Sequence, residues 1–328
     1  MKKHERRAMT APGKKSHTIL VTGAAGFVAG SVITQAPREW TLHLISRRQI
    51  PRQQPNWVLH RADSADPDAI GAIILQTSPD AVIPTAAIAN IDYCETHQDE
   101  AFRMNTEVTR AVVDACVRTG AKLVFCSTDN VFDGRRGWYR EGDVPNPINY
   151  YGFTKHAAEK IIAAEPHLKA VIARIALVMG MPLLGSARPF MVRMFEDLAT
   201  NGPVWAPPGE VRTPVDVISL GRALLELSEH DYAGIIHLAG PDRIDRVDLV
   251  RALVHRTGGN PDRVQPIDAE TIPNRALRPP DLSLDTSLAR KILRTPLPGI
   301  SEGFHLVMEA WERVKTGAEP EAYLPCGS

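Results

Sequence analysis

Short apolar runs alternate with longer amphipathic stretches along the first half of the chain. The runs are rich in aliphatic residues and bounded by turn formers, which predicts buried strands. They span 18–22, 41–45, 57–60, 81–85, 122–127 and 170–175, and helices are expected at 27–36, 66–76, 96–119 and 150–164. Strands that alternate with helices of this length predict a parallel sheet covered by helices on both faces.

The pattern changes at 181–211 and 241–315, where prolines are frequent and only short helices and few strands are expected. The apolar run 235–239 lies between these segments and is expected to return to the sheet. We therefore predict an α/β protein with a Rossmann-like, doubly wound parallel sheet and a smaller, discontinuous α/β substrate lobe. The predicted limits are 18–180 and 212–240 for the first domain, 181–211 and 241–315 for the lobe, 1–17 for a disordered extension and 316–328 for a tail.

Composition is that of an ordinary globular protein, with 44% hydrophobic and 23% charged residues among 328. No apolar run reaches the roughly 18 residues of a transmembrane helix. The chain has 38 basic and 38 acidic residues, so its formal charges cancel. Residues 1–17 hold six basic residues and one acidic residue, which leaves 32 basic and 37 acidic residues in the rest of the chain. An acidic body argues against nucleic-acid binding. The basic start lacks the apolar stretch of a secretory signal, so it is read as a solvated extension, with a membrane or nucleic-acid tether as the alternative.

The cysteines Cys94, Cys116, Cys126 and Cys326 include no C-x-x-C pair and do not cluster with histidines at zinc-site spacing. Three of them lie in apolar or helical segments, where cysteine behaves as a small buried hydrophobe. We expect a reducing cytoplasm, no disulfides and no metal site.

A glycine-rich turn at 22–29 joins the first strand to the first helix. Gly23 suits a tight turn, and Gly26 lets the backbone approach a pyrophosphate at the helix N-terminus. The spacing is G-x-x-G-x-x-A, with Ala29 where a third glycine is common and Gly30 after it. In this position the turn predicts nucleotide binding.

The second strand ends in Arg47 and Arg48, where an NAD-specific site carries an acidic residue for the ribose 2′-hydroxyl. Two guanidinium groups suit a 2′-phosphate instead, so NADP(H) is the expected cofactor. Asp63 follows the third strand and is placed either to meet the adenine ring or to cap a turn.

Tyr151 and Lys155 lie one turn apart on the helix expected at 150–164. A tyrosine with an ordinary pKa of about 10 is a poor acid or base at neutral pH, but a nearby ammonium and a cationic nicotinamide lower that pKa. Ser127 and Thr128 end the fifth strand, where α/β sheets hold their sites. A hydroxyl there can bond the substrate oxygen beside Tyr151.

These motifs resemble the extended short-chain dehydrogenase/reductase superfamily and, within it, the dTDP-4-dehydrorhamnose reductase family. The resemblance covers residues 18–315. The matching segments are TGAAGFVA at 22–29, AAIANIDYCE at 86–95, Met104-Asn105, STDNVFDG at 127–134, Tyr139-x-Glu141-x-Asp143, Pro147, Tyr151-Gly152-x-x-Lys155, Arg174, RTPVDV at 212–217 and RPPDLSLD at 278–285.

The resemblance implies a role for each site residue. Tyr151 would donate the proton, Thr128 would polarise the carbonyl, and Lys155 would bind the nicotinamide ribose and tune Tyr151. The cofactor would also contact Gly23, Ala25, Gly26, Phe27, Val28, Arg47, Arg48, Asp63, Ser64, Ala86, Ala87 and Asn105, and the substrate would contact Asp129. We further predict that the second lobe contacts the substrate through Arg212 and Arg278. Both of these arginines stand beside prolines and suit a diphosphate, with ordinary surface arginine as the alternative.

The chain departs from the family pattern at three points. Asn130 follows Thr-Asp where the family has tyrosine, Leu177 replaces a tryptophan, and Pro84-Thr85 stands where the fourth strand usually ends in asparagine. The sugar and the nucleotide therefore stay open.

Three functions remain in view. The first is an NADPH-dependent reductase of a keto group on a nucleotide-activated sugar. The second is a sugar-nucleotide epimerase or dehydratase of the same superfamily, although Asn130 cannot be the base that dehydratases carry after Thr-Asp. The third is a non-catalytic NADP-binding regulator, because the beta subunit of methionine adenosyltransferase resembles this family and acts by binding a partner. A homodimer is possible.

Overall fold

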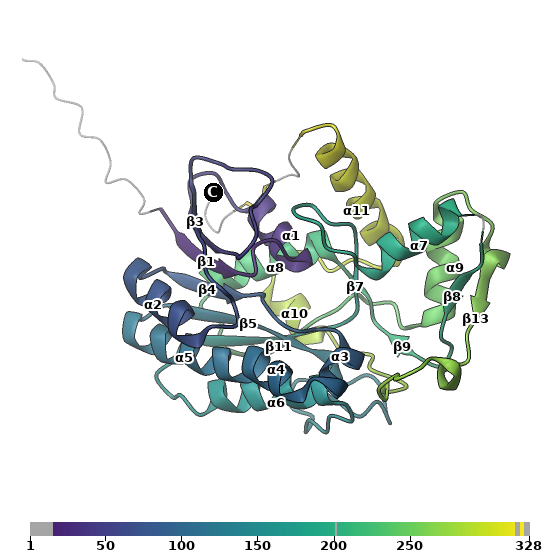
Figure 1. Ribbon diagram of the computed structural model, residues 1–328, viewed down its shortest axis with the longest axis horizontal. Coiled ribbons are helices and arrows are strands. Elements are labelled where there is room, and N and C mark those ends of the chain that lie inside the picture. The colour runs from purple at the N-terminus through teal and green to yellow at the C-terminus, as the bar shows by residue number, and fades with distance from the viewer. Residues whose placement is uncertain (1–15, 201, 319–321, 325–328) are drawn as a thin grey trace, which may run out of the picture.

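A seven-stranded parallel sheet forms the centre of the molecule, in the order β11-β6-β5-β4-β1-β2-β3 (Figure 1). The structure is a computed structural model that describes residues 16–200, 202–318 and 322–324. The strands are β1 (Thr18–Thr22), β2 (Thr41–Ile45), β3 (Trp57–His60), β4 (Ala81–Pro84), β5 (Lys122–Thr128), β6 (Ala170–Ile175) and β11 (Gly234–Leu238). Each lies within one residue of its expected range, and the order confirms the doubly wound fold.

Helices cover both faces of this sheet because its strands are apolar at successive positions. Ile19 and Val21 of β1 point into one core, whereas Leu20 between them points into another. The first core is closed by α1 (Phe27–Gln35) and α8 (Val217–Glu229), and the second by α2 (Pro67–Thr77), α5 (Val108–Thr119) and α6 (Tyr150–Ala163). A strand buried on both faces gives a continuous apolar run in the sequence.

Strand β11 completes the sheet beside β6, with Ile235 opposite Ile172 in a parallel pair. The expected return of the chain to the sheet is thus confirmed. Helix α10 (Ser287–Ile292) packs near this strand.

The prediction of one continuous helix over 96–119 is wrong in its first part. Helix α3 (Ile91–Thr96) ends at His97, α4 (Gln98–Phe102) follows, and a π-helical segment over Arg103–Glu107 leads into α5. Apolar spacing predicts a helix but not the extra residue that a π-turn inserts, and such turns are frequent at functional sites.

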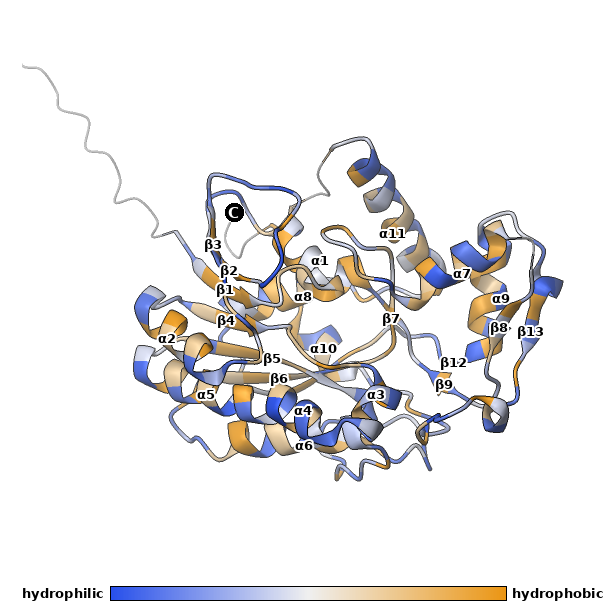
Figure 2. Cartoon of the chain, in the orientation of Figure 1, coloured by the Kyte–Doolittle hydropathy of each residue, from blue (hydrophilic) through white to orange (hydrophobic). Residues whose placement is uncertain are grey.

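The second lobe consists of helices and short paired strands around its own apolar core, visible on the right of Figures 1 and 2. One helix, α11, is longer than the short helices expected. The elements are α7 (Phe190–Ala199), α9 (Arg246–Arg256) and α11 (Ile300–Lys315), with β7 (Val178–Met179) paired to β10 (Val215–Asp216), β8 (Val204–Ala206) to β13 (Val264–Pro266), and β9 (Val211–Arg212) to β12 (Ile244–Asp245). The exact limits of the two domains stay predictions.

Most of the basic extension at 1–17, part of the tail at 316–328, and Cys326 lie outside the described residues. Within the described ranges, Cys94, Cys116 and Cys126 are free thiols. No group of three or more metal-binding side chains is found in that part of the chain. None of the helices described has the length and apolar character needed to cross a membrane.

Candidate active site

The glycine turn between β1 and α1 packs directly against the segment that follows β4. Gly23 has a φ of +65°, and a Cβ on it would lie 2.9 Å from the Cα of Ala86, so only glycine fits. Gly26 is the N-cap of α1 and supplies no capping side chain. The first amides of α1 and the positive end of its dipole are therefore available to an anion. This is the arrangement that binds pyrophosphate.

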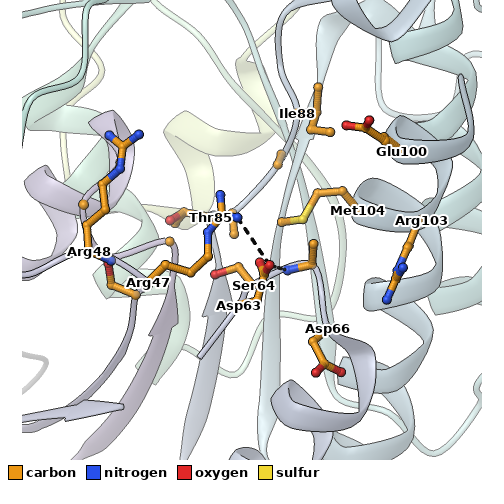
Figure 3. A pocket seen from close by; sticks show the side chains of 17 residues that line it. Arg47, Arg48, Asp63, Ser64, Asp66, Thr85, Ile88, Glu100, Arg103 and Met104 are labelled. Atoms are coloured by element: carbon orange, nitrogen blue, oxygen red, sulfur yellow. Dashed lines mark hydrogen bonds and ion pairs between the residues drawn. The ribbon is translucent and has the colours of Figure 1, made fainter. Parts of the chain in front are cut away.

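A cavity of about 740 Å³ lies beside this turn (Figure 3). Nine of the residues expected to contact the cofactor line it: Gly23, Ala25, Gly26, Arg47, Arg48, Asp63, Ser64, Ala86 and Ala87. The opposite wall in Figure 3 holds Ile88, Glu100, Arg103 and Met104, none of which was predicted to contact the cofactor. Two of these belong to the π-helical segment, whose geometry no apolar pattern announces.

Two of the expected cofactor residues bind each other. Nη1 of Arg47 lies 3.3 Å from Oδ2 of Asp63 (Figure 3). Oδ1 of Asp63 accepts from the amide of Ala65 at 2.9 Å, so Asp63 caps a turn as well as lining the cavity. The two side chains are 70% and 45% exposed, and an ion pair in that setting contributes at most about 1 kcal/mol. Arg47 can therefore leave Asp63 for a phosphate at little cost.

Asn105 lies among the walls of neither this cavity nor the catalytic one described next. Its buried side chain accepts from the amide of Ile88 at 2.9 Å and donates to the carbonyl of Ile88 at 3.0 Å and to the hydroxyl of Thr154 at 3.1 Å. Asn105 thus shapes the cavity wall through Ile88, which differs from the direct contact that the resemblance implied.

A second cavity, of about 340 Å³, brings the expected catalytic residues together. It adjoins the first, because three residues line both. Its walls include Thr128 from β5, Tyr151 and Lys155 from α6, Phe27 and Val28 from α1, and the shared residues Gly26, Thr85 and Ala87. The two cavities form one path from the arginines to the Tyr151–Lys155 pair.

Tyr151 is half-buried and hydrogen-bonded to Thr128. Burial raises the pKa of Tyr151 above its usual value, although the Thr128 hydrogen bond acts in the opposite direction. The lowered pKa expected from the sequence depends in part on a bound cationic nicotinamide, so it stays a prediction for the site with cofactor. The phenol is therefore protonated at neutral pH but is a weaker acid than an ordinary tyrosine, so proton donation would need a nearby cation to lower its pKa.

Lys155 is only 3% exposed, and its Nζ lies 4.0 Å from the centre of the Phe125 ring. Burial lowers the pKa of Lys155 to about 8, while Cys126 and Glu159 act to raise it. The ammonium is therefore charged at neutral pH and loses its proton in mildly alkaline solution.

Asp129 follows Thr128 and is buried. Its Oδ1 accepts from the Thr128 hydroxyl at 3.1 Å and from Nδ2 of Asn130 at 2.8 Å. Its Oδ2 has no hydrogen-bond partner among the described residues, and Nε of Arg212 lies 4.0 Å away. Burial raises the pKa of Asp129, against the effects of Arg212 and these hydrogen bonds. A buried carboxylate oxygen without a donor suits a hydroxyl of a ligand.

The two arginines expected to contact substrate have different surroundings. Arg212 is buried beside Asp129 at the catalytic end. Arg278 instead donates to Oδ1 of Asp92 at 2.8 Å and to the carbonyl of Ala276 at 2.9 Å. Neither arginine lines either of the two cavities, and Asp129 does not line them either. Oδ1 of Asp92, on α3, also accepts from the amide of Ala276. Asp92 and Arg278 together therefore hold the segment 276–278 against α3.

A third cavity, of about 350 Å³, lies in the second lobe and was not anticipated. Three arginines, two aromatic rings and two carboxylates are among its lining residues: Arg188, Arg193, Arg246, Phe190, Trp205, Glu196 and Asp197. Arg188 is paired with Glu196. The guanidinium of Arg246 lies over the ring of Phe190, 4.1 Å from its centre. The arginines come from the segment before α7, from α7 and from α9, so their proximity depends on the packing of the lobe.

Known proteins share this architecture and these motifs. The chain matches the family described as RmlD substrate binding domain over residues 17–312. It belongs to that family. The dTDP-4-dehydrorhamnose reductase of Mycobacterium tuberculosis is 30% identical to it over 271 residues, covering 80% of this chain and 83% of that protein. Methionine adenosyltransferase 2 subunit beta of Bos taurus is 28% identical over 314 residues, which cover 90% of each protein.

Solved structures of the extended short-chain dehydrogenase/reductase superfamily share the fold. A hypothetical dTDP-4-dehydrorhamnose reductase from Sulfolobus tokodaii has a TM-score of 0.74 at 30% identity, covering 86% of this chain and 96% of that one. The dTDP-4-dehydrorhamnose reductase of Bacillus anthracis, in complex with NADP, has a TM-score of 0.78 at 21% identity, covering 90% and 99%. The family resemblance expected from the sequence is confirmed.

Proposed function

We propose that this chain is an NADPH-dependent reductase of a keto group on a nucleotide-activated sugar. The observation that carries the proposal is the meeting of Thr128, Tyr151 and Lys155 in a cavity that adjoins the glycine turn. The similarity to proteins named dTDP-4-dehydrorhamnose reductase supports the same activity.

The residues present fit a dinucleotide phosphate. The close approach of Gly23 and Ala86 and the uncapped start of α1 would hold the pyrophosphate. Arg47 and Arg48 would hold a 2′-phosphate, which favours NADP(H) over NAD(H). When bound, NADPH supplies the hydride that the keto carbon accepts.

The chain's own residues then manage the proton. Tyr151 gives its phenolic proton to the carbonyl oxygen, so the keto group becomes a hydroxyl and Tyr151 is left as a phenolate. The Thr128 hydroxyl, which donates to Asp129 in this structure, would turn to donate to the same oxygen and polarise it. Lys155, charged at neutral pH, stabilises the phenolate and would also reach the cofactor ribose.

The nucleotide part of the substrate would extend from Asp129 and Arg212 toward the third cavity. Burial, together with the charges of Arg212 and Arg193, lowers the pKa of Arg246 to about 10, against the opposite effect of Glu210. Guanidinium groups that repel one another in this way favour a diphosphate between them. The exposed ring of Trp205 offers a surface for a base.

A second candidate function is a non-catalytic NADP-binding regulator. It is favoured by the match to methionine adenosyltransferase 2 subunit beta, which covers 90% of this chain, against 80% for the match to the Mycobacterium tuberculosis reductase. A dehydratase is disfavoured, because the Asn130 amide donates to Asp129 and is no base. Arg47 and Arg48 disfavour the tightly retained NAD expected of an epimerase or a dehydratase. The expected cytoplasmic location and the homodimer stay predictions.

The test combines cofactor binding with turnover. NADPH and NADH are titrated by fluorescence, and oxidation of NADPH is then followed with dTDP-4-dehydrorhamnose and with other 4-keto sugar nucleotides. We expect tighter binding of NADPH and turnover of at least one sugar that Tyr151→Phe abolishes. Tight NADPH binding without turnover of any keto sugar would favour the regulator instead.

A further inference from the structure

Helix α6 is fastened to the end of β5 on both sides of the Tyr151–Lys155 pair. Before the pair, Nδ2 of Asn149 donates to Oδ1 of Asn130 at 3.3 Å. After it, the Ser127 hydroxyl donates to Oε1 of Glu159 at 2.5 Å. In the sequence, Thr128 lies between Ser127 and Asn130. In the same way, Tyr151 and Lys155 lie between Asn149 and Glu159.

The Asn149 end fixes the start of the helix. Oδ1 of Asn149 caps α6 by accepting from the amide of Gly152 at 2.8 Å. A Cβ on Gly152 would collide with the carbonyl oxygen of Asn130, so the helix packs on the strand end at backbone distance. No room is left there for the helix to slide.

The Glu159 end is a buried charged cluster. Glu159 accepts from Arg174 of β6 through both oxygens, at 3.0 and 2.8 Å, and Ser127, Glu159 and Arg174 are each at most 4% exposed. Although burial opposes it, nearby His156, the hydrogen bonds from Arg174 and Ser127, and the Arg174 charge lower the pKa of Glu159 to about 2. Nδ1 of His156 lies 3.7 Å from Oε2 of Glu159. Arg174 also donates to the carbonyl of Glu141, which ties the loop after β5 to the same cluster.

Tyr151, Lys155 and Glu159 are spaced four residues apart and form one stripe along α6. We propose that Ser127, Glu159 and Arg174 are positioning residues: their cluster holds this stripe at the height where the Tyr151 hydroxyl meets Thr128 and the Lys155 ammonium meets the cofactor. The proposal deepens the reductase proposal and rests on it. A displacement of about 1 Å at reacting groups can cost on the order of 100-fold in rate.

A cluster that served folding alone would give the same hydrogen bonds, so the test needs matched controls. Ser127→Ala removes one neutral donor and leaves the Glu159–Arg174 pair intact. Its control is Ser228→Ala on α8, a serine that is also buried and donates to the carbonyl of Leu225 at 2.7 Å. Glu159→Gln is paired with Glu226→Gln, where a fully buried glutamate accepts from the amides of Arg294 and Thr295.

The experiment measures kcat, KM, the solvent isotope effect, melting temperature and NADPH affinity for these four variants, with dTDP-4-dehydrorhamnose as substrate. We expect Ser127→Ala to lower kcat about tenfold and to enlarge the solvent isotope effect, with KM for the sugar within about twofold of wild type. Ser228→Ala should keep kcat within about twofold for a similar loss of melting temperature. Glu159→Gln should lower kcat more than Ser127→Ala, because Arg174 is left uncompensated.

Equal kcat values for Ser127→Ala and Ser228→Ala, with unchanged isotope effects, would overturn the positioning role. If wild type turns over no keto sugar, the reductase proposal fails, and the role of the cluster is then decided by NADPH affinity. Weaker NADPH binding by Ser127→Ala and Glu159→Gln than by their controls supports it, because Lys155 is displaced. Equal affinity rejects it.

Discussion

The two ends of the cleft are built in opposite ways. At the adenine end Arg47 is 70% exposed and its pairing with Asp63 is easily exchanged. At the catalytic end Lys155 is 3% exposed, and the surrounding Thr128, Asp129 and Glu159 form buried hydrogen bonds. Recognition of a charged phosphate tolerates mobile side chains, because its attraction acts over several ångströms. Proton transfer needs atoms held in hydrogen-bond contact.

The largest expected effect is at the rigid end. Tyr151→Phe keeps the ring but removes the proton donor, so kcat should fall by about 10²–10⁴ while NADPH affinity stays near normal. Thr128→Ala removes one hydrogen bond and no proton source, so its loss should be smaller. Steady-state kinetics and fluorescence titration measure both. Wild-type turnover by Tyr151→Phe would show that Tyr151 is not the proton donor.

Lys155→Met should damage both functions, because the ammonium serves Tyr151 and the cofactor ribose. We expect a fall in kcat of about 100-fold and weaker NADPH binding by about tenfold. The same change should raise the melting temperature at neutral pH, since it removes a charge whose burial is unfavourable. A variant with normal NADPH affinity would contradict the ribose contact.

At the exposed end, replacing Arg47 and Arg48 together by alanine should weaken NADPH binding by about 1–3 kcal/mol and leave NADH unchanged. Calorimetric titration of both cofactors measures this. Asp63→Asn sharpens the comparison, because it frees Arg47 and should tighten NADPH slightly. Arg110→Ala, on the exposed face of α5, is the control. Equal binding of both cofactors by wild type would refute the assignment.

Substitutions at the two arginines predicted to bind the substrate should differ in their effect on KM. Arg212→Ala removes a buried cation beside Asp129 and should raise KM for the sugar nucleotide about tenfold. Arg278→Ala breaks a pairing with Asp92 outside the cavities and should change KM by about twofold or less. Steady-state kinetics with both variants decides this, and a larger effect from Arg278 would restore the role given to it by the resemblance.

The smallest effect concerns pH. The pKa of Lys155 is about 8 in the folded chain against an ordinary value of 10.5. Below about pH 8 the buried ammonium destabilises the fold, and this cost is relieved as pH rises toward 10.5. Activity should fall over the same range as Lys155 loses its proton, so kcat and the Lys155 contribution to stability move in opposite directions. A pH profile of kcat that stays flat above pH 8 would contradict the need for a charged lysine.

Much of the site could be predicted because its signals are local. The glycines at 23 and 26, the Tyr151–Lys155 spacing and the strand-end Thr128 each depend on one element and its neighbour. Arg278 was predicted from its place beside prolines and Asn105 from the resemblance, and neither lines the two cavities of the cleft. The same is true of Arg212 and Asp129. Arg278 is bound by Asp92 and Asn105 by Ile88, and in each case the partner lies in another segment of the chain.

The sequence by itself determined the alternating strands and helices, the glycine turn, the cationic end of β2 and the acid–base pair. Strand and helix periodicities are properties of the local chain. Only the tertiary structure decided which charges meet. Arg47 with Asp63, Arg212 with Asp129 and Arg174 with Glu159 are brought together by the packing of separate elements. Burial then set the protonation of Tyr151 and Lys155, since the cost of a charge depends on the dielectric around it, and no residue carries that surrounding in its own sequence.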